Sequence, residues 1–490
     1  MFSLFKKKKE LPSIPETSSR SFTAAATNRL VDWVLSFAKI NATLKQDYIQ
    51  LVLRARDLAK NNEFIVGYLE NMKRNVIGKD GFTLQCKPKT IKGEHDSESA
   101  VLIESLWKEY QGAFRKFVTL DETQGGRDFD ILILRTLITD GEVFIRRVED
   151  PFSKFGYRYE LLDSLTIDPY YNEELDYNGA RVVMGVELDK RGREVAFWMR
   201  DNRNSDQYFC GERVRISADD VLHVYRKYFS NQTRGYTPLA GIIMNLSQMD
   251  AYKEAEIIHA RIQACSMAVF EKNGSNGGAL QRQTDAKGDV PAEFAPGMFV
   301  FAPDGYTTKS IQNTSNTSIF GSFWKAVLRS IANALGLSYN KASGDYESVN
   351  YSSLREATLE DRASFEELQQ FFIDSWKEHQ FYYFLDACIQ NRLLFGDIDS
   401  LFPHKFFGRR FPWVDPQKEI SALEKEYDLL LTDPITELEA RGVDPDEALE
   451  RWARWKQKVD EKKLSFMQQD PLKIASEPEP IPIQQGGQNV

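Results

Sequence analysis

The segment IANALGLSYNKASGDYESVNYSSLR, from Ile331 to Arg355, joins two helical patterns through a short polar stretch. Before it, SFWKAVLRSIANALGL carries apolar residues at helical spacing, and after it neither glycine nor proline occurs between Asp345 and Phe395. Its polar centre, GDYESVNYSSLRE, is compatible with a nucleophile loop, a phosphate-binding loop, or a turn that begins a helix and faces a mobile ligand. The choice among these three interpretations decides the fold and the function.

The sequence around this segment does not favour catalysis. Ser352 and Ser353 have no candidate base within local reach and no oxyanion motif, whereas serine is common at the first position of a helix. The chain also lacks the nucleotide-binding motifs GxxxxGK[ST] and GxGxxG and the hydrolase motifs HExxH and GxSxG. Ser352 or Ser353 is therefore predicted to cap a helix, and no catalytic residue and no cofactor are expected.

One pair of carboxylates offers an enzymatic alternative. In GGRDFDILILR, Asp128 and Asp130 lie two residues apart, so on a strand they would share a face and could hold magnesium for nucleotidyl transfer. An aspartate before an apolar run is equally a cap or turn residue, and no third carboxylate on a neighbouring strand is evident. The alternative function is therefore a magnesium-dependent nucleotidyltransferase or nuclease, while the favoured prediction contains no metal site and no enzyme activity.

Composition limits the class of protein further. The chain has 490 residues, 42% of them hydrophobic, which suffices for several domains with buried cores. Its formal net charge of -9 does not suit a tight, sequence-reading DNA-binding protein. No apolar run reaches the length of a bilayer-spanning helix and the N-terminus lacks a secretory signal, so we expect a protein made in a cytoplasm, with no membrane contact. The four cysteines are far apart and are expected to be reduced and mostly buried: Cys86, Cys210, Cys265 and Cys388.

Periodicity predicts an α+β fold with helical extensions. Residues 127–228 contain short β-rich runs separated by turn residues, which predicts a mostly antiparallel sheet that begins with ILILRTLITDGEVFIRR. Residues 242–273 lack glycine and proline and predict a helix, and a compact insert separates it from a returning helix. Three Asp-Pro pairs predict capped C-terminal helices at Asp415, Asp433 and Asp444. Between residues 343 and 370, seven acidic and two basic residues predict an acidic, partly exposed helix start.

Five segments in this order resemble the lambda-type portal proteins of tailed bacteriophages. The resemblance covers residues 28–469 and rests on the following stretches: RARDLAKNNEFIVGYLENMKRNVIGKDGFTLQ (54–85), RGYTPLAG (234–241), IANALGLSYNKASGDYESVNYSSLR (331–355), PWVDPQKEI (412–420) and RGVDPDEALE (441–450).

The resemblance implies a portal fold with an α/β wing, a helical stem, a small α/β clip and a helical crown. The regions it implies are a disordered N-terminal tail at 1–26, the wing at 27–235, a stem helix at 236–268, the clip at 269–315, a returning stem helix at 316–335, a tunnel loop at 336–354, a long helix of the tunnel and wing at 355–410, the crown at 411–470 and a disordered C-terminal tail at 471–490.

The resemblance also implies the function. Such proteins form a homo-oligomeric ring, usually of twelve subunits, at one capsid vertex of the virion, assembled in the host cytoplasm. Double-stranded DNA passes through the channel without sequence-specific contacts during packaging and ejection. The implied partners are the terminase large subunit, a head-tail connector or adaptor, the major capsid protein and the scaffold. A capsid scaffolding or adaptor protein without a channel is a third hypothesis.

Within this family the polar segment corresponds to a loop that faces the channel, and an acidic surface would let DNA slide past without gripping its phosphates. The candidate DNA-channel residues are Lys341, Asp345, Tyr346, Glu347, Asn350, Tyr351, Ser352 and Arg355.

Overall fold

The computed structural model describes residues 38–462, except 91–92, 94, 176–178, 201–207, 209, 265–267, 273–305, 311–316, 348, 413–414, 441–442 and 444. Between residues 262 and 320 only the backbone elements are described. The predicted tails at 1–26 and 471–490 therefore lie outside the described residues, as does the start of the predicted wing at 27–37.

The N-terminal part is mainly helical. Asn62 separates the first two helices and caps the second, because its side-chain oxygen accepts hydrogen bonds from the amides of Phe64 and Ile65. The elements are α1 (Ile40–Asn61), α2 (Glu63–Met72), a π-helical turn (Lys73–Ile77), β1 (Thr83–Cys86), α3 (Ser97–Gln111) and α4 (Gly126–Thr139).

Two antiparallel sheets follow. The first has the order β3-β2-β9 and the second the order β4-β5-β6-β7-β8. Their strands are β2 (Glu142–Glu149), β3 (Tyr157–Leu162), β4 (Glu173–Glu174), β5 (Arg181–Val183), β6 (Val186–Leu188), β7 (Glu194–Arg200), β8 (Arg213–Ser217) and β9 (Val221–Tyr225). All strand pairings within these sheets are antiparallel, which confirms the predicted α+β class with antiparallel sheets.

The predicted β-rich region begins too early, since ILILRTLIT forms the end of α4 and not a strand. The buried side chains of α4 include Phe129, Ile133, Leu134, Leu137 and Ile138, which recur at intervals of three and four residues. That spacing places them on one helical face. Asp128 and Asp130 therefore lie on helix α4 and not on the strand that the magnesium alternative requires.

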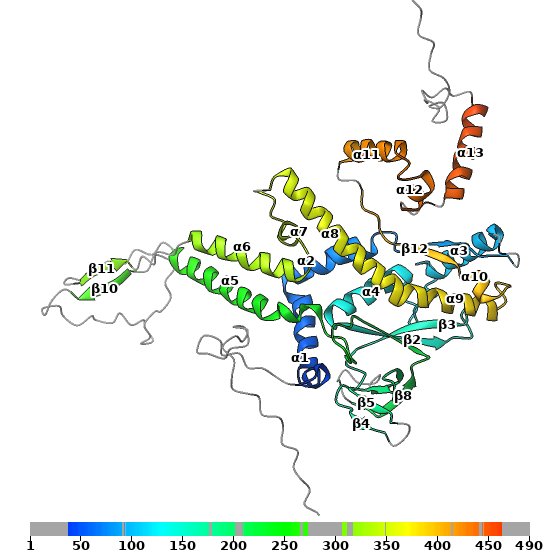
Figure 1. Cartoon of the computed structure of the whole chain (residues 1–490). Helices are drawn as coiled ribbons and strands as arrows, with labels where there is room; N and C mark the ends of the chain where they lie inside the picture. Colours follow the sequence, from blue (N-terminus) through cyan, green and yellow to red (C-terminus); the bar gives the residue numbers. More distant parts are fainter. Residues whose placement is uncertain are drawn as a thin grey trace, which may run out of the picture.

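A pair of helices extends away from the sheets (Figure 1). A short 3₁₀ turn (Pro238–Gly241) leads into α5 (Ile243–Ala264), and α6 (Thr317–Ala334) returns beside it. Between them, β10 (Ala268–Lys272) pairs antiparallel with β11 (Tyr306–Ser310). The predicted outgoing and returning helices are confirmed. The outgoing helix is shorter than the predicted range 242–273, since it ends at Ala264 and strand β10 begins at Ala268. Most of the insert between the strands lies outside the described residues.

One long helix crosses the molecule (Figure 1). It comprises α8 (Tyr351–Phe372), a π-helical turn (Ile373–Lys377) and α9 (Glu378–Gln390), followed by α10 (Ile398–Leu401). Phe365, Trp376 and Phe384 are buried in the main core, whereas Tyr382 is 46% exposed.

After the long helix, β12 (His404–Phe407) pairs with β1, and three helices end the described chain. They are α11 (Pro416–Asp428), α12 (Pro434–Ala440) and α13 (Pro445–Glu461). Asp415 accepts from the amide of Lys418, and Asp433 accepts from the amide of Thr436, which confirms two of the predicted caps. Asp444 lies outside the described residues. Among the described helices, none combines the length and apolarity needed to cross a bilayer.

Candidate functional site

The polar segment contains a short helix and a loop between α6 and α8. Helix α7 spans Tyr339–Ser343, and Gly344 ends it with a φ of 70°, a conformation that glycine adopts without strain. Ser338 begins it and donates its hydroxyl to the Asp361 carboxylate at 2.7 Å, while its amide donates to the same group at 2.6 Å. Because Asp361 belongs to α8 and is buried, it fixes α7 against the long helix.

Asp345 anchors the loop to the returning helix α6. Its carboxylate lies 2.8 Å from the Lys325 ammonium, and the Tyr339 hydroxyl donates to it at 2.9 Å. The amide of Glu347 donates to the other carboxylate oxygen at 3.2 Å. These hydrogen bonds, that from Lys325 above all, lower the pKa of Asp345 to about 2. Asp345 is therefore ionised and oriented at neutral pH.

The other candidate channel residues differ in exposure. Tyr346 and Tyr351 are 52% and 55% exposed. Glu347, Asn350 and Ser352 are also exposed, whereas Lys341 and Arg355 are half-buried. The Nε of Arg355 is buried without a hydrogen-bond partner among the described residues. The structure thus gathers the predicted residues on one loop and helix start, but only some of them present their side chains to solvent.

The predicted serine cap of the long helix was wrong. Asn350 caps α8, because its side-chain oxygen accepts a hydrogen bond from the Ser353 amide at 2.8 Å. Ser352 and Ser353 lie within the first turn. Asparagine caps helices as well as serine does, so the sequence NYSS contained the signal.

The start of α8 also contacts the C-terminal helices. The Tyr351 hydroxyl lies 3.4 Å from the carboxylate of Asp415, the residue that caps α11. Arg362, about three turns further along α8, donates to the carbonyl of Pro412 at 2.7 Å. The loop is therefore linked at one end to α6 and at the other to α11.

A buried ionic cluster, not anticipated from the sequence, holds the entry to α5. Arg234 is fully buried, and its guanidinium contacts the Glu142 carboxylate at 2.6 Å and the Tyr48 hydroxyl at 2.8 Å. The Gly235 amide donates to the other oxygen of Glu142 at 2.7 Å. The backbones of Gly235 and Gly141 touch so closely that an added Cβ on Gly235 would lie 2.3 Å from the Gly141 carbonyl oxygen. RGYTPLAG thus fastens the helical pair to the sheet region.

His223 belongs to the same cluster. Its ring nitrogens lie 2.9 Å from Glu142 and 3.0 Å from Glu194, and its side chain is 1% exposed. Burial opposes protonation of this imidazole, but the two carboxylates outweigh it and raise the pKa of His223 to about 9. Contact with Arg234 and His223 likewise overcomes burial and lowers the pKa of Glu142 to about 2. The cluster is therefore a buried, charge-compensated joint.

Asp128 and Asp130 are not brought together as a metal site. Asp130 is buried and lies 3.0 Å from the Lys377 ammonium, and it accepts a hydrogen bond from the Trp376 indole at 2.8 Å. Asp128 is 54% exposed and pairs with Arg127. The two carboxylates follow each other by two residues on a helix, so they point in different directions. No cluster of three or more metal-ligating side chains occurs within the described part of the chain.

The cysteines that can be assessed match their prediction in part. Cys86 and Cys388 are buried free thiols, and burial raises the pKa of Cys388 to about 12, which makes it unreactive. Cys210 forms no disulfide within the described residues and is only half-buried. Cys265 lies outside the described residues.

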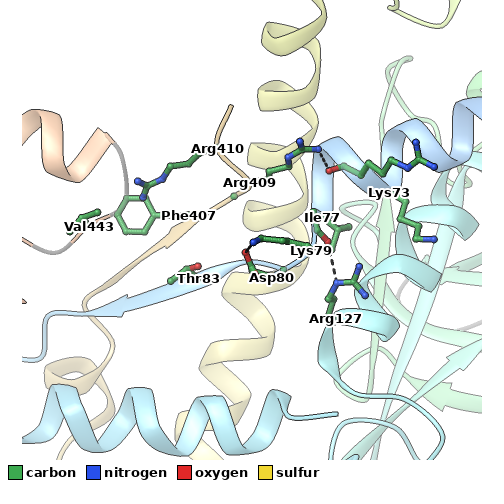
Figure 2. Close-up of a pocket in the computed structure, with 14 residues that line it drawn as sticks. Lys73, Ile77, Lys79, Asp80, Thr83, Arg127, Phe407, Arg409, Arg410 and Val443 are labelled. Atoms are coloured by element: carbon green, nitrogen blue, oxygen red, sulfur yellow. Dashed lines mark hydrogen bonds and ion pairs between the residues drawn. The ribbon is translucent and has the colours of Figure 1, made fainter. Parts of the chain in front are cut away.

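A basic pocket, also missed from the sequence, opens beside the long helix (Figure 2). It has a volume of about 740 Å³ and lies between the turn after the π-helical segment 73–77, the start of α4 and the end of β12. Its charged lining comprises Lys73, Arg74, Lys79, Asp80, Arg127, Arg409 and Arg410. The six basic residues come from three segments that are far apart in the sequence, and each segment contributes only one to three of them.

Comparison of the chain with known proteins shows its family. Residues 26–369 match the family model described as "Phage portal protein, lambda family". The chain is 28% identical over 452 residues to a probable portal protein of Halomonas phage phiHAP-1, covering 88% of this chain and 85% of that protein. It is 20% identical over 401 residues to portal protein B of Escherichia phage lambda, covering 75% and 74% of the two chains.

A solved structure of the neck of a native gene transfer agent particle, with C12 symmetry, is 12% identical. It covers 82% of this chain and 94% of that one, with a TM-score of 0.45. The sequence match, which extends over residues 26–369 and includes both the RGYTPLAG and the GDYESVNYSSLRE segments, decides the assignment. The chain belongs to the lambda family of phage portal proteins.

Proposed function

We propose that this chain assembles into a ring at one vertex of a phage capsid and forms the channel through which DNA is packaged and ejected. The observation that carries the proposal is the family match over residues 26–369. The helical pair α5 and α6 projecting from the sheet region supports it, because such a pair can line a pore when copies are arranged around an axis (Figure 1). A net charge of -9 also suits a channel that DNA passes without binding.

We further propose how the chain divides into the regions that this function requires. We assign the wing to residues 27–235 with part of 355–410, the stem to α5 and α6, the clip to 269–315, the tunnel loop to 336–354 and the crown to 411–470. The buried joint of Arg234 and Glu142 would transmit force between the wing and the stem, because both charges are fully buried and bonded. The clip would dock the terminase large subunit and later the head-tail connector. The wing and crown would face the major capsid protein and the scaffold.

Within the channel, the proposed DNA-facing segment is 345–351. Tyr346 and Glu347 are exposed there, whereas Asp345 is held by Lys325 and orients the loop from behind. A carboxylate at Glu347 repels phosphates, so DNA slides past it. A lysine at that position would attract each phosphate in turn.

The experiment is a packaging assay with capsids built on Glu347→Lys portals. The amount of DNA protected from nuclease inside capsids is expected to fall, while the portal rings seen by electron microscopy remain normal. Glu174→Lys, an exposed charge reversal on strand β4, is the matched control and should package normally. Packaging unchanged by Glu347→Lys would contradict the assignment of this loop. Deleting residues 275–290 should instead impair terminase or connector docking to intact rings, and normal docking would refute the clip assignment.

A further inference from the structure

The exposed face of α8 carries a row of acids. Glu356, Glu360 and Glu367 are exposed and separated by four and seven residues, so they lie on one face over about 16 Å of helix. Glu367 is 76% exposed and has a single ion pair, with Arg226 at 3.4 Å. Within the described residues Glu356 and Glu360 form no ion pair. We call these three residues the acidic stripe.

The basic pocket keeps a surplus of positive charge after its internal pairs are counted. Lys73 pairs with Glu70 at 3.0 Å, Arg127 pairs with Asp128 at 3.1 Å, and Lys79 pairs with Asp80 at 3.8 Å (Figure 2). Within the described residues, Arg409 donates hydrogen bonds to two uncharged acceptors, the Arg74 carbonyl and the Asn75 side-chain oxygen. Arg74 and Arg410 are exposed at the rim. The pocket is thus a cationic concavity in a chain whose net charge is -9.

The stripe and the pocket lie on opposite sides of the same helix. Gln369 follows Glu367 by two residues, a rotation of about 200° on an α-helix. The Gln369 amide donates to the carbonyls of Asn75, Val76 and Arg409, and Arg409 lines the pocket. One face of α8 therefore presents acids to solvent, while the opposite face is fixed to the pocket wall.

From this arrangement we propose that the acidic stripe of one copy docks against the basic pocket of the next copy in the ring. In a closed ring, two different surfaces of the same chain meet at each interface, so surfaces of opposite charge on opposite sides of one helix are suited to it. Such complementarity fixes register and rejects wrong partners. The inference rests on the proposed ring, and it assigns the stripe to the subunit interface while leaving Glu347 to the channel.

Two charge-reversal variants test the interface from both sides. Arg74→Glu with Arg410→Glu inverts the pocket rim, and Glu356→Lys with Glu360→Lys inverts the stripe. All four positions are exposed, so the substitutions act mainly on surface charge; Arg410→Glu also removes a cation–π contact with the Phe407 ring, whose centroid lies 5.8 Å from the guanidinium. Lys190→Glu with Arg191→Glu, on the exposed hairpin between β6 and β7, is the control for a change of net charge. Ring formation is measured by native mass spectrometry and electron microscopy.

Each variant alone is expected to need at least about tenfold more protein for half-assembly than the wild type, because like charges then face each other. An equimolar mixture of the two should assemble again, with the variants alternating around rings of even subunit number. A chain that carries all four reversals should also assemble alone. The control should behave as the wild type.

The possible failures are distinguishable. If the wild type forms no ring, the proposed function itself fails. If wild type and both single-side variants assemble equally, the ring stands and the interface proposal is overturned. If the pocket variant assembles normally but retains less double-stranded DNA at low salt, the pocket contacts DNA phosphates, which also overturns the proposal. Rescue in the mixture is the result that only the proposed interface produces.

Discussion

The carboxylate of Asp345 lies 2.8 Å from the ammonium of Lys325, so the polar loop is bonded to the middle of the returning helix α6. Lys325 is 44% exposed, and partly exposed ion pairs contribute little to the free energy of unfolding. The contact therefore orients the loop and does not hold the fold together. Movements of α6 would reach residues 345–351 through this pair.

Lys325→Met removes the charge and keeps the length of the side chain. We expect the free energy of unfolding to change by less than about 1 kcal/mol, because the pair is partly exposed. Backbone amides of residues 344–350 should exchange with deuterium several-fold faster, since the loop loses its anchor. Arg193→Met, which removes a comparable exposed pair with Asp189 on the hairpin between β6 and β7, should leave that exchange unchanged. Unaltered exchange in Lys325→Met would contradict the anchoring role.

Arg234→Met should be among the most destabilising single changes in the chain. It leaves the fully buried Glu142 carboxylate without its guanidinium partner, and breaking such a pair typically costs about 3–5 kcal/mol. Arg193→Met removes an exposed pair with Asp189 and is expected to cost less than about 1 kcal/mol. Urea denaturation of both variants measures the difference. If the two variants lost similar amounts of unfolding free energy, the buried pair of Arg234 and Glu142 would not have the stabilising role assigned to it.

Stability should fall as the pH rises above neutrality. His223 has a folded pKa of about 9 against an ordinary value of 6.5, so its contribution is complete below pH 6.5 and is lost as the pH rises through 9. A shift of this size corresponds to roughly 3 kcal/mol. Denaturation between pH 6 and pH 10 should show this loss. His223→Gln, which cannot be protonated, should be less stable at pH 6 and lack most of this slope, and an unchanged slope would contradict the assignment.

Asp130→Asn and Asp128→Asn should differ sharply although the two residues are neighbours in sequence. Asp130→Asn leaves the buried Lys377 ammonium without a counter-charge, so a loss of about 3–5 kcal/mol in the free energy of unfolding is expected. Asp128→Asn removes only an exposed pair and should be nearly neutral. If instead both variants fold normally and both lose a magnesium-dependent nuclease activity present in the wild type, the ion-pair account of Asp130 is wrong.

Local sequence patterns predicted many of the helices and strands but not the contacts between distant segments. The absence of glycine and proline in 242–273 predicted a helix, which the structure contains at Ile243–Ala264, and the Asp-Pro pairs at 415 and 433 predicted the starts of α11 and α12. The run ILILRTLIT was misassigned because short, β-branched apolar runs fit a strand and a buried helix equally well. Packing decides between strand and helix for this run, because Phe129, Ile133 and Leu137 are spaced so that they share one buried helical face.

The sequence predicted which segment forms the candidate site, but not which distant residues contact it. The polar composition of 344–356 marked the loop, but its anchor, Lys325, lies twenty residues earlier on another helix. Arg234 and Glu142 are separated by 92 residues, and the pocket combines residues from 73 to 443. Such pairings depend on tertiary contacts that no local pattern encodes.

Electron microscopy of the purified protein shows directly whether this chain forms a ring around a channel. We expect annular particles with a central opening and rotational symmetry, in which α5 and α6 of each copy line the opening. Monomers that persist at high concentration, with no annular particles, would contradict it.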